Sequence, residues 1–246
     1  MLTNNEFKIL RQLKQKKYRQ EQALFLVEGK KMVEEVLKSS FVVKNVFATE
    51  SFIEKSDAFD NVITTITKTQ SEQLSSLVTD PEVYALVEMK KDNYDDSVLK
   101  DRVLILDDVS DAGNLGTIIR TADWFNIDLI VCSEDCVELY NSKVLQASMG
   151  SFTRVDVIYR NLADFIPKHN YIYYGAFLDG QAVNDVYFSS SPTALVLGSE
   201  SHGISETVAQ LISNRINIPL INTNRVVPES LNVATATAIL CYAWTK

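Results

Sequence analysis

The second half of the chain alternates short apolar runs with longer segments whose apolar residues recur every three or four positions. The runs predict buried strands, and the recurring pattern predicts amphipathic helices. The expected strands are Val103–Leu106, Leu129–Cys132, Val155–Ile158, Tyr171–Phe177, Ala194–Leu197 and Ile216–Ile218. Five helices are expected. The first begins at Gly113 or Asn114 and ends at Phe125, and the others span residues 141–149, 162–168, 206–213 and 233–244. Because strands and helices alternate and the strands are almost wholly apolar, we expect a parallel sheet covered on both faces.

The first part of the chain shows a similar but shorter alternation. A polar segment, Asn4–Gln22, predicts a helix, and Met32, Val33, Val36 and Leu37 share one face of a second helix, Lys30–Ser39. Four strands are expected at Ala23–Val27, Val42–Ala48, Val62–Ile66 and Val83–Met89, with a further helix at Lys68–Leu77. This pattern predicts a small α/β unit with a mostly parallel sheet.

The segment between these parts, KKDNYDDSVLK at residues 90–100, is polar and has no apolar period. Such a composition is typical of an interdomain linker. We therefore expect a first domain at residues 1–92, a linker at 93–101 and a second domain at 102–246.

Composition places the chain among soluble globular proteins. Its 246 residues are 46% hydrophobic and 23% charged, and no apolar run is long enough to cross a membrane. The polar N-terminus does not resemble a signal peptide. The three cysteines, Cys132, Cys136 and Cys241, lie in apolar surroundings and are too few for a disulfide framework. These features predict a cytoplasmic protein with reduced thiols and no membrane partner.

The charge is uneven along the chain. The formal net charge of −8 argues against non-specific coating of nucleic acid. Residues 8–19, however, contain six cations and no acid, among them Lys16, Lys17 and Arg19 around Tyr18. An aromatic ring among cations is suited to contact RNA. A solvated helical face explains the charge pattern equally well.

Several common site types do not fit the motifs. Gly113 and Gly116 follow a strand but lack the G-x-G-x-x-G spacing of a dinucleotide site, and no acid ends the second strand. Ser199, Ser201 and His202 are not set in the G-x-S-x-G motif of a hydrolase. Cys132 and Cys136, in a chain with two histidines, do not form a zinc pattern and are better explained as core thiols.

Three other segments place polar residues where a strand ends or a helix begins. They are Asn114 to Arg120, Leu197 to Ser205 around Glu200, and Pro228 to Ala234 around Ser230 and Asn232. In open α/β sheets, ligands bind at the carboxyl ends of strands. Singly, Asn114 or Ser230 is explained as a helix cap and Arg120 as a surface residue. Together, the three segments favour one site.

In their order and spacing these segments resemble the three signature motifs of the SpoU family of RNA ribose 2′-O-methyltransferases, within the SPOUT superfamily. The first segment carries Asn114 and Arg120, the second Leu197-Gly198-Ser199-Glu200 with Gly203-Ile204-Ser205, and the third Ile218-Pro219 with Ser230-Leu231-Asn232. Near the N-terminus, Lys17-Tyr18-Arg19 and Phe25 to Gly29 are similar to the RNA-substrate-binding domain of the family.

The resemblance implies a parallel-sheet methyltransferase domain with a C-terminal trefoil knot, preceded by a small α/β RNA-substrate-binding domain. It also implies a homodimer, S-adenosylmethionine as cofactor, no metal, and structured RNA as substrate, with ribosomal RNA preferred over transfer RNA. Catalytic residues would be Asn114, Arg120, Glu200, Ser230 and Asn232. Cofactor-binding residues would be Leu197, Gly198, Ile218, Leu220 and Leu231, and RNA-binding residues Lys16, Lys17 and Arg19.

For the reaction we expect Arg120 to clamp an RNA phosphate and orient the ribose hydroxyl, because a guanidinium is a poor base. Asn114 and Glu200 would hold Arg120, and the phosphate would accept the proton. The chain departs from the family pattern at Ser201-His202 and in a longer loop before Ser230, where Arg225 is a candidate RNA contact. The alternative function is a catalytically inactive RNA-binding relative, which weak affinity for S-adenosylmethionine would reveal.

Overall fold

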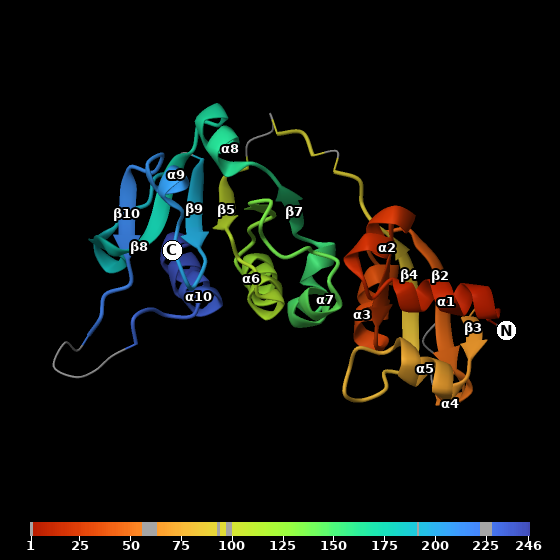
Figure 1. Ribbon diagram of the computed structural model, residues 1–246. Coiled ribbons are helices and arrows are strands. Elements are labelled where there is room, and N and C mark those ends of the chain that lie inside the picture. Colours follow the sequence, from red (N-terminus) through yellow and green to blue (C-terminus); the bar gives the residue numbers. More distant parts are fainter. Residues whose placement is uncertain (1, 56–62, 93, 97–99, 191, 222–227) are drawn as a thin grey trace.

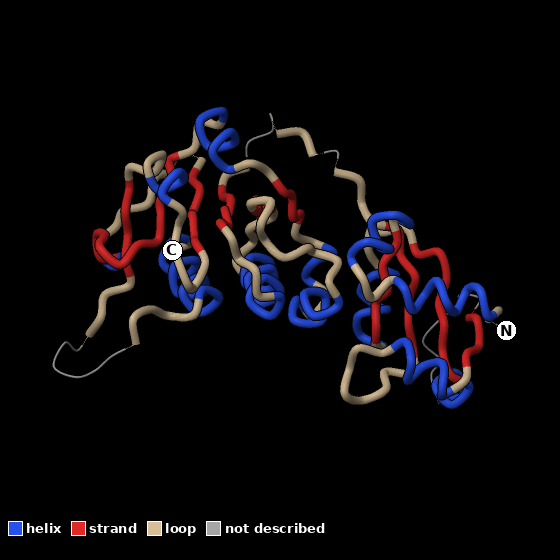
Figure 2. The backbone as a smooth tube through the Cα atoms, viewed as in Figure 1, coloured by secondary structure: helices blue, strands red, loops and turns tan. Residues whose placement is uncertain are grey.

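The chain folds around two separate sheets, each with its own helices (Figures 1 and 2). A computed structural model describes residues 2–55, 63–92, 94–96, 100–190, 192–221 and 228–246. The first sheet has four strands and the second has six. The two α/β units of the expected fold class are therefore present in the expected order. None of the helices in the described part of the chain is long and apolar enough to span a membrane.

The N-terminal unit has the strand order β1-β4-β2-β3. Its strands are β1 (Leu24–Glu28), β2 (Val43–Thr49), β3 (Ile63–Ile66) and β4 (Val83–Glu88), and its helices are α1 (Asn4–Gln12), α2 (Lys16–Gln22), α3 (Lys30–Leu37), α4 (Glu50–Lys55) and α5 (Lys68–Leu74). Strand β4 runs antiparallel to both β1 and β2, and only β2 and β3 are parallel. The expectation of a mostly parallel sheet was wrong here, because apolar periodicity identifies a strand but not its direction.

The expected helix Asn4–Gln22 is in fact two helices. Thr3 and Glu6 form a capping box that starts α1, and the extended backbone of Gln15 starts α2. The turn between them buries Leu13 beside Leu10, and the Lys14 ammonium donates to the carbonyls of Gln73 and Ser75. The break lets the chain wrap around the end of α5 instead of continuing into solvent.

The C-terminal sheet is parallel throughout, with the order β10-β8-β9-β5-β6-β7. Its strands are β5 (Arg102–Asp107), β6 (Leu129–Cys132), β7 (Asp156–Tyr159), β8 (Ile172–Ala182), β9 (Thr193–Gly198) and β10 (Asn214–Asn217). The chain adds β6 and β7 on one side of β5 and later β9 on the other. The boundary between β5 and β9 is thus a switch point, where ligands bind in open α/β sheets.

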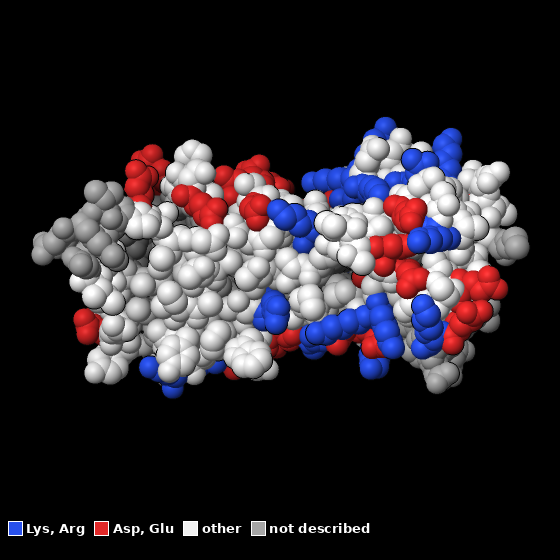
Figure 3. Space-filling model, turned by 90° about the horizontal axis from the view of Figure 1, so that it is seen from below, with Lys and Arg blue, Asp and Glu red and all other residues white. Residues whose placement is uncertain are grey.

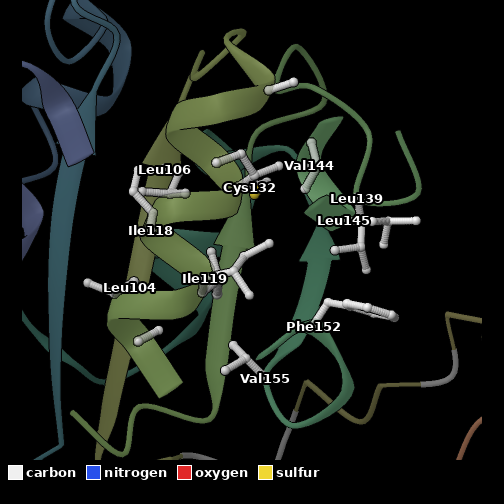
Figure 4. Packing of buried hydrophobic residues seen from close by; sticks show 14 of the residues in the cluster. Leu104, Leu106, Ile118, Ile119, Cys132, Leu139, Val144, Leu145, Phe152 and Val155 are labelled. Atoms are coloured by element: carbon white, nitrogen blue, oxygen red, sulfur yellow. The ribbon is translucent and has the colours of Figure 1, made fainter. Parts of the chain in front are cut away.

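Helices cover both faces of this sheet, as the apolar strands predicted. The helices are α6 (Ala112–Trp124), α7 (Ser142–Ser148), α8 (Leu162–Lys168), α9 (Glu206–Ala209) and α10 (Val233–Trp244). Residues of α6 and α7 pack with Leu104, Leu106 and Cys132 on one face (Figure 4), and residues of α10 belong to the same apolar cluster. Residues of α8 and α9 pack with Val103, Ile105 and Val131 on the other. Helix α9 is shorter than the 206–213 expected. The expected trefoil knot involves the chain between β10 and α10, which includes residues 222–227 outside the described residues.

The two units meet through a continuous apolar core. Two aromatic rings of the N-terminal unit pack against two of the C-terminal unit. The ring centroids of Phe25 and Tyr140 are 4.5 Å apart. Those of Phe41 and Phe152 are 5.6 Å apart. The polar stretch between the units is held by Arg160, which donates to both carboxylate oxygens of Asp96 at 2.8 Å. The contact between the units is therefore a packed interface.

Candidate active site

Three segments that are far apart in the sequence meet at the side chain of Asn232. Its amide Nδ2 donates to Oδ1 of Asn114 at 2.9 Å and also to Oε1 of Glu200. The backbone N–H of Val233 donates to the same Glu200 oxygen at 3.3 Å. The structure thus brings together three of the five expected catalytic residues. We call Asn114, Glu200 and Asn232 the central cluster.

Helix starts position two members of this cluster. Asn232 is the N-cap of α10, and its Oδ1 accepts from the backbone N–H groups of Ala234 and Thr235. Asn114 lies in the first turn of α6, whose N-cap is Asp111. The alternative explanations of Asn114 and Ser230 as N-caps were therefore wrong, since neither residue caps its helix.

The loop that carries Glu200 folds back onto the end of β9. Ser199 and Gly203 exchange two backbone hydrogen bonds, at 2.9 and 3.1 Å. A Cβ at Gly198 would overlap the backbone of Gly203 and Ile204, so only glycine permits this fold. The buried carboxylate of Asp107, at the end of β5, accepts from the backbone N–H of Ser205 at 2.7 Å. The sequence reasoning missed Asp107, although an acid at the end of a central strand was a usable signal.

The start of α6 is held by a second pair that the sequence reasoning missed. The Lys143 ammonium lies 3.3 Å from Asp111, whose other carboxylate oxygen accepts from the backbone N–H of Asn114 at 2.8 Å. These contacts, the Asn114 hydrogen bond above all, lower the pKa of Asp111 below its usual value. Asp111 is therefore a carboxylate at neutral pH, as its capping role requires.

Arg120 and Ser230 are not part of the central cluster. Both are exposed, and neither side chain makes a hydrogen bond or ion pair with a described residue. Within the described chain, Asn114 and Glu200 are hydrogen-bonded to Asn232 and not to Arg120, so the expectation that they hold Arg120 stays a prediction. Arg120 therefore presents an unpaired guanidinium on the outer face of α6.

The expected cofactor residues lie around the ends of β9 and β10. Leu197 is buried, Gly198 and Ile218 are partly buried, and Leu220 and Leu231 are 58% and 48% exposed. Next to Ile218, the amide oxygen Oδ1 of Asn217 is buried without a hydrogen-bond partner in the described structure. Exposed leucines and an unpaired acceptor are features that a ligand with an apolar body and amine donors would satisfy. The residues present therefore fit an adenosyl cofactor.

The candidate RNA-binding residues separate into two groups. Lys16 and Lys17 are exposed at the start of α2. Arg19 is only 4% exposed, donates to the carbonyls of Leu13 and Lys14, and lies 2.6 Å from Glu138 of the other unit. Its guanidinium is engaged by contacts that join the two units, so an RNA contact of Arg19 stays a prediction that its surroundings do not favour. Arg225 lies outside the described residues.

Other chemistries find no support in the described part of the chain. The three cysteines there are buried free thiols, as expected of core residues. No group of His, Cys, Asp and Glu side chains among the described residues has the arrangement of a metal site.

The sequence model of the SpoU rRNA Methylase family matches residues 101–242, which include the whole central cluster. The chain belongs to the SpoU rRNA methylase family. A second model, the MRM3-like substrate binding domain, matches residues 4–85. The expected family, enzyme class and two-part architecture are thereby confirmed, and we call the C-terminal unit the methyltransferase domain.

Relatives of this SpoU protein match almost its entire length. The chain is 31% identical to the 23S rRNA (guanosine(2553)-2′-O)-methyltransferase RlmP of Bacillus subtilis, over 97% of this chain and 95% of the relative. It is similar in structure to a putative RNA methyltransferase of the TrmH family from Porphyromonas gingivalis, with a TM-score of 0.87, 35% identity and coverage of 99% and 98% of the two chains.

An AdoMet-bound rRNA methyltransferase from Sinorhizobium meliloti also matches, with a TM-score of 0.84, 26% identity and coverage of 99% of this chain and 95% of the other. This likeness confirms S-adenosylmethionine as the expected cofactor. The residues around Gly198, Asn217 and Leu231 also fit this cofactor, as described above.

Proposed function

We propose that this SpoU protein methylates the ribose 2′-hydroxyl of a guanosine in 23S ribosomal RNA. The central cluster carries the proposal, because it joins all three motif segments at the switch point of the parallel sheet. The whole-length likeness to the B. subtilis 23S rRNA enzyme supports the choice of substrate. Action on ribosomal RNA also supports a cytoplasmic location.

The bound cofactor would supply an electrophilic sulfonium methyl group, held by the segments around Gly198, Ile218 and Leu231. The chain itself has to place a weakly acidic hydroxyl in line with that methyl group. Asn232 has both amide hydrogens engaged, which fixes its orientation. The amide nitrogen Nδ2 of Asn114 and the second carboxylate oxygen Oε2 of Glu200 have no partner among the described residues. These two atoms are available to hydrogen-bond the ribose.

Arg120 is assigned to the phosphate next to the target ribose. Its guanidinium is exposed and unpaired in the described chain, and it lies on the same helix as Asn114. A guanidinium binds phosphate through two parallel hydrogen bonds but does not act as a base near neutral pH. The role of Arg120 is therefore to orient the hydroxyl, with a phosphate oxygen as the proton acceptor.

Methyl transfer to ribosomal RNA from a strain lacking this gene tests the proposal. The full-length protein should transfer labelled methyl groups to one 23S ribose, and Arg120→Ala should lower kcat/KM by about 100-fold or more. Because the exposed Arg120 side chain makes no hydrogen bond or ion pair with a described residue, its loss should leave the melting temperature almost unchanged. Arg102→Ala is the matched control. Arg102 is also exposed, but it begins β5 and therefore lies at the end of the strand away from the central cluster.

Two results would contradict the proposal. One is methylation of a base, or of transfer RNA, in place of a ribosomal ribose. The other is near-normal transfer by the Arg120→Ala protein.

We also infer that two copies associate through α6 and α10. These helices pack against each other, and their outer faces expose Trp124, Ile239 and Tyr242. Figure 3 looks onto the layer of α6, α7 and α10 and shows few charged side chains over the methyltransferase domain. An exposed apolar face of this kind is typical of a protein interface. Association would place Arg120 near a neighbouring copy, so the site is proposed to use both subunits.

A further inference from the structure

A cavity of about 570 Å³ lies at the junction of the two units, apart from the central cluster. Its walls come from α2, the end of β4, the polar connecting stretch and the region of β7. Aromatic side chains make up much of the lining, namely Phe41, Tyr94, Tyr140, Phe152 and Tyr159. We call this space the junction cavity.

One buried hydroxyl in the lining of the junction cavity has no partner among the described residues. The Tyr140 hydroxyl accepts from the backbone N–H of Lys90 at 3.0 Å, and the Tyr159 hydroxyl donates to the carbonyl of Val137 at 2.8 Å. The Tyr94 hydroxyl is buried and makes no hydrogen bond in the described structure. Burial raises its pKa to about 12, so the group stays protonated at neutral pH. A buried hydroxyl without a partner is costly unless a ligand supplies one.

The charges at the mouth of the cavity leave cations available. Three of the four carboxylates in the cavity lining form ion pairs. The pairs are Glu138 with Arg19 at 2.6 Å, Asp92 with Arg160 at 2.5 Å and Asp156 with Lys90 at 3.5 Å. Lys16 and Lys91 are exposed and make no ion pair with the described residues, and Glu134 is the one acid in the lining without an ion pair to them. The mouth thus offers two free ammonium groups to an anion.

The cavity is also preformed. Arg160 fixes the connecting stretch through Asp92 and Asp96, and Arg19 and Tyr140 fix the N-terminal unit against the other wall. A ligand therefore meets walls that are already in place, which lowers the entropic cost of binding.

We propose that the junction cavity binds an unpaired nucleotide of the RNA substrate, with the base against the aromatic walls and its phosphate at Lys16 and Lys91. Proteins recognise single-stranded RNA by stacking splayed bases on aromatic rings and by hydrogen-bonding their edges. We assign such a hydrogen bond to the Tyr94 hydroxyl, because it has no partner among the described residues. This inference rests on the proposed function, because it takes the same RNA as substrate.

The test uses the full-length protein and a single-stranded RNA of mixed sequence that carries photoreactive 4-thiouridine. Cross-links mapped by mass spectrometry should fall on peptides that contain Tyr94, Tyr140 or Tyr159. Lys91→Glu should weaken RNA binding about tenfold, and Tyr94→Phe, which removes only the hydroxyl, about fivefold. Lys68→Glu is the matched control, because Lys68 begins α5 on the face of sheet β1-β4-β2-β3 turned away from the junction.

Three other outcomes would overturn the cavity inference, the proposed function or the RNA assignment. If wild-type protein methylates ribosomal RNA while cross-links avoid the cavity and both variants bind RNA normally, the cavity inference is wrong and the proposed function stands. If wild-type protein methylates no RNA, the proposed function fails whatever the cavity binds. If GMP or UMP fills the cavity in NMR titrations but RNA does not cross-link there, the ligand is a free nucleotide and the RNA assignment is overturned.

Discussion

Asn232 combines a structural and a functional task in one side chain. Its oxygen caps α10, while its amide hydrogens hold Asn114 and Glu200 in place. The two tasks use different atoms, so a substitution can separate them. Aspartate keeps the capping oxygen but cannot donate a hydrogen bond at neutral pH.

Asn232→Asp should therefore remove activity without unfolding the protein. We expect kcat to fall about 100-fold as Asn114 and Glu200 lose their common partner. The free energy of unfolding should change by less than about 1 kcal/mol, because the N-cap remains. Steady-state methyl transfer and urea unfolding measure the two effects. Thr235→Ala, which removes a different contact of Asn232, is the control, and normal turnover by the Asn232→Asp protein would contradict the assigned role.

At the scale of elements, the position of α6 depends on its contact with α7. Gly116 lies at this contact, where an added Cβ would stand 2.5 Å from Cβ of Ala147 and 2.5 Å from the carbonyl oxygen of Val144. The glycine lets the two backbones approach closely. The same contact brings Lys143 to Asp111 and thereby fixes the first turn of α6.

Gly116→Ala should force α6 away from α7 and destabilise the protein by roughly 1–3 kcal/mol. Gly113→Ala in the same helix is the control, because the nearest atom to its Cβ would be the Asp111 side chain, at 3.0 Å. Without a backbone clash, alanine should be neutral there or stabilise the helix by up to about 1 kcal/mol. Thermal unfolding of the two proteins compares them directly, and equal melting temperatures would show that the helices are not in close contact.

At the scale of the whole molecule, one buried ion pair joins the two units. Arg19 and Glu138 are 119 residues apart in the sequence, and their side chains are 5% and 11% exposed. Around them the aromatic rings of Phe25, Phe41, Tyr140 and Phe152 form the apolar part of the interface. These contacts fix the orientation of the N-terminal unit relative to the central cluster.

Arg19→Met should destabilise the protein by about 3–5 kcal/mol, because it leaves Glu138 buried without a partner. Lys17→Met, two positions earlier, should change stability by less than about 0.5 kcal/mol, since that side chain is 73% exposed. Adding Glu138→Leu to Arg19→Met should recover most of the loss. Urea unfolding measures all three. A stable Arg19→Met protein with weak RNA affinity would contradict the structural role and favour Arg19 as an RNA contact.

Association through α6 and α10 is the second prediction at this scale. Tyr242, 57% exposed on α10, should lie inside the interface. Tyr242→Glu should raise the dimer Kd by about 30-fold or more, because a carboxylate would be buried there. Sedimentation velocity follows the change. Val78→Glu is the control, as Val78 is fully exposed on the N-terminal unit; a monomeric wild-type protein would refute the interface.

The sequence by itself determined the parallel sheet, the helices on both its faces and the three segments of the site. These features depend on local patterns, namely continuous apolar runs such as β5 and β9 and a few residues at the end of a strand or the start of a helix. Such patterns are complete within a short window of the chain, so no knowledge of distant contacts is needed to interpret them.

Only the tertiary structure decided the direction of β4, the burial of Arg19 and the partner of Glu200. Each depends on residues far away in the sequence: β4 inserts between β1 and β2, Arg19 meets Glu138, and Asn232 meets Asn114 across 118 positions. A charged or amide side chain hydrogen-bonds equally well to solvent, RNA or protein. The packing of the completed fold decides which of these partners the side chain contacts. That packing cannot be predicted from the residues next to it in the sequence.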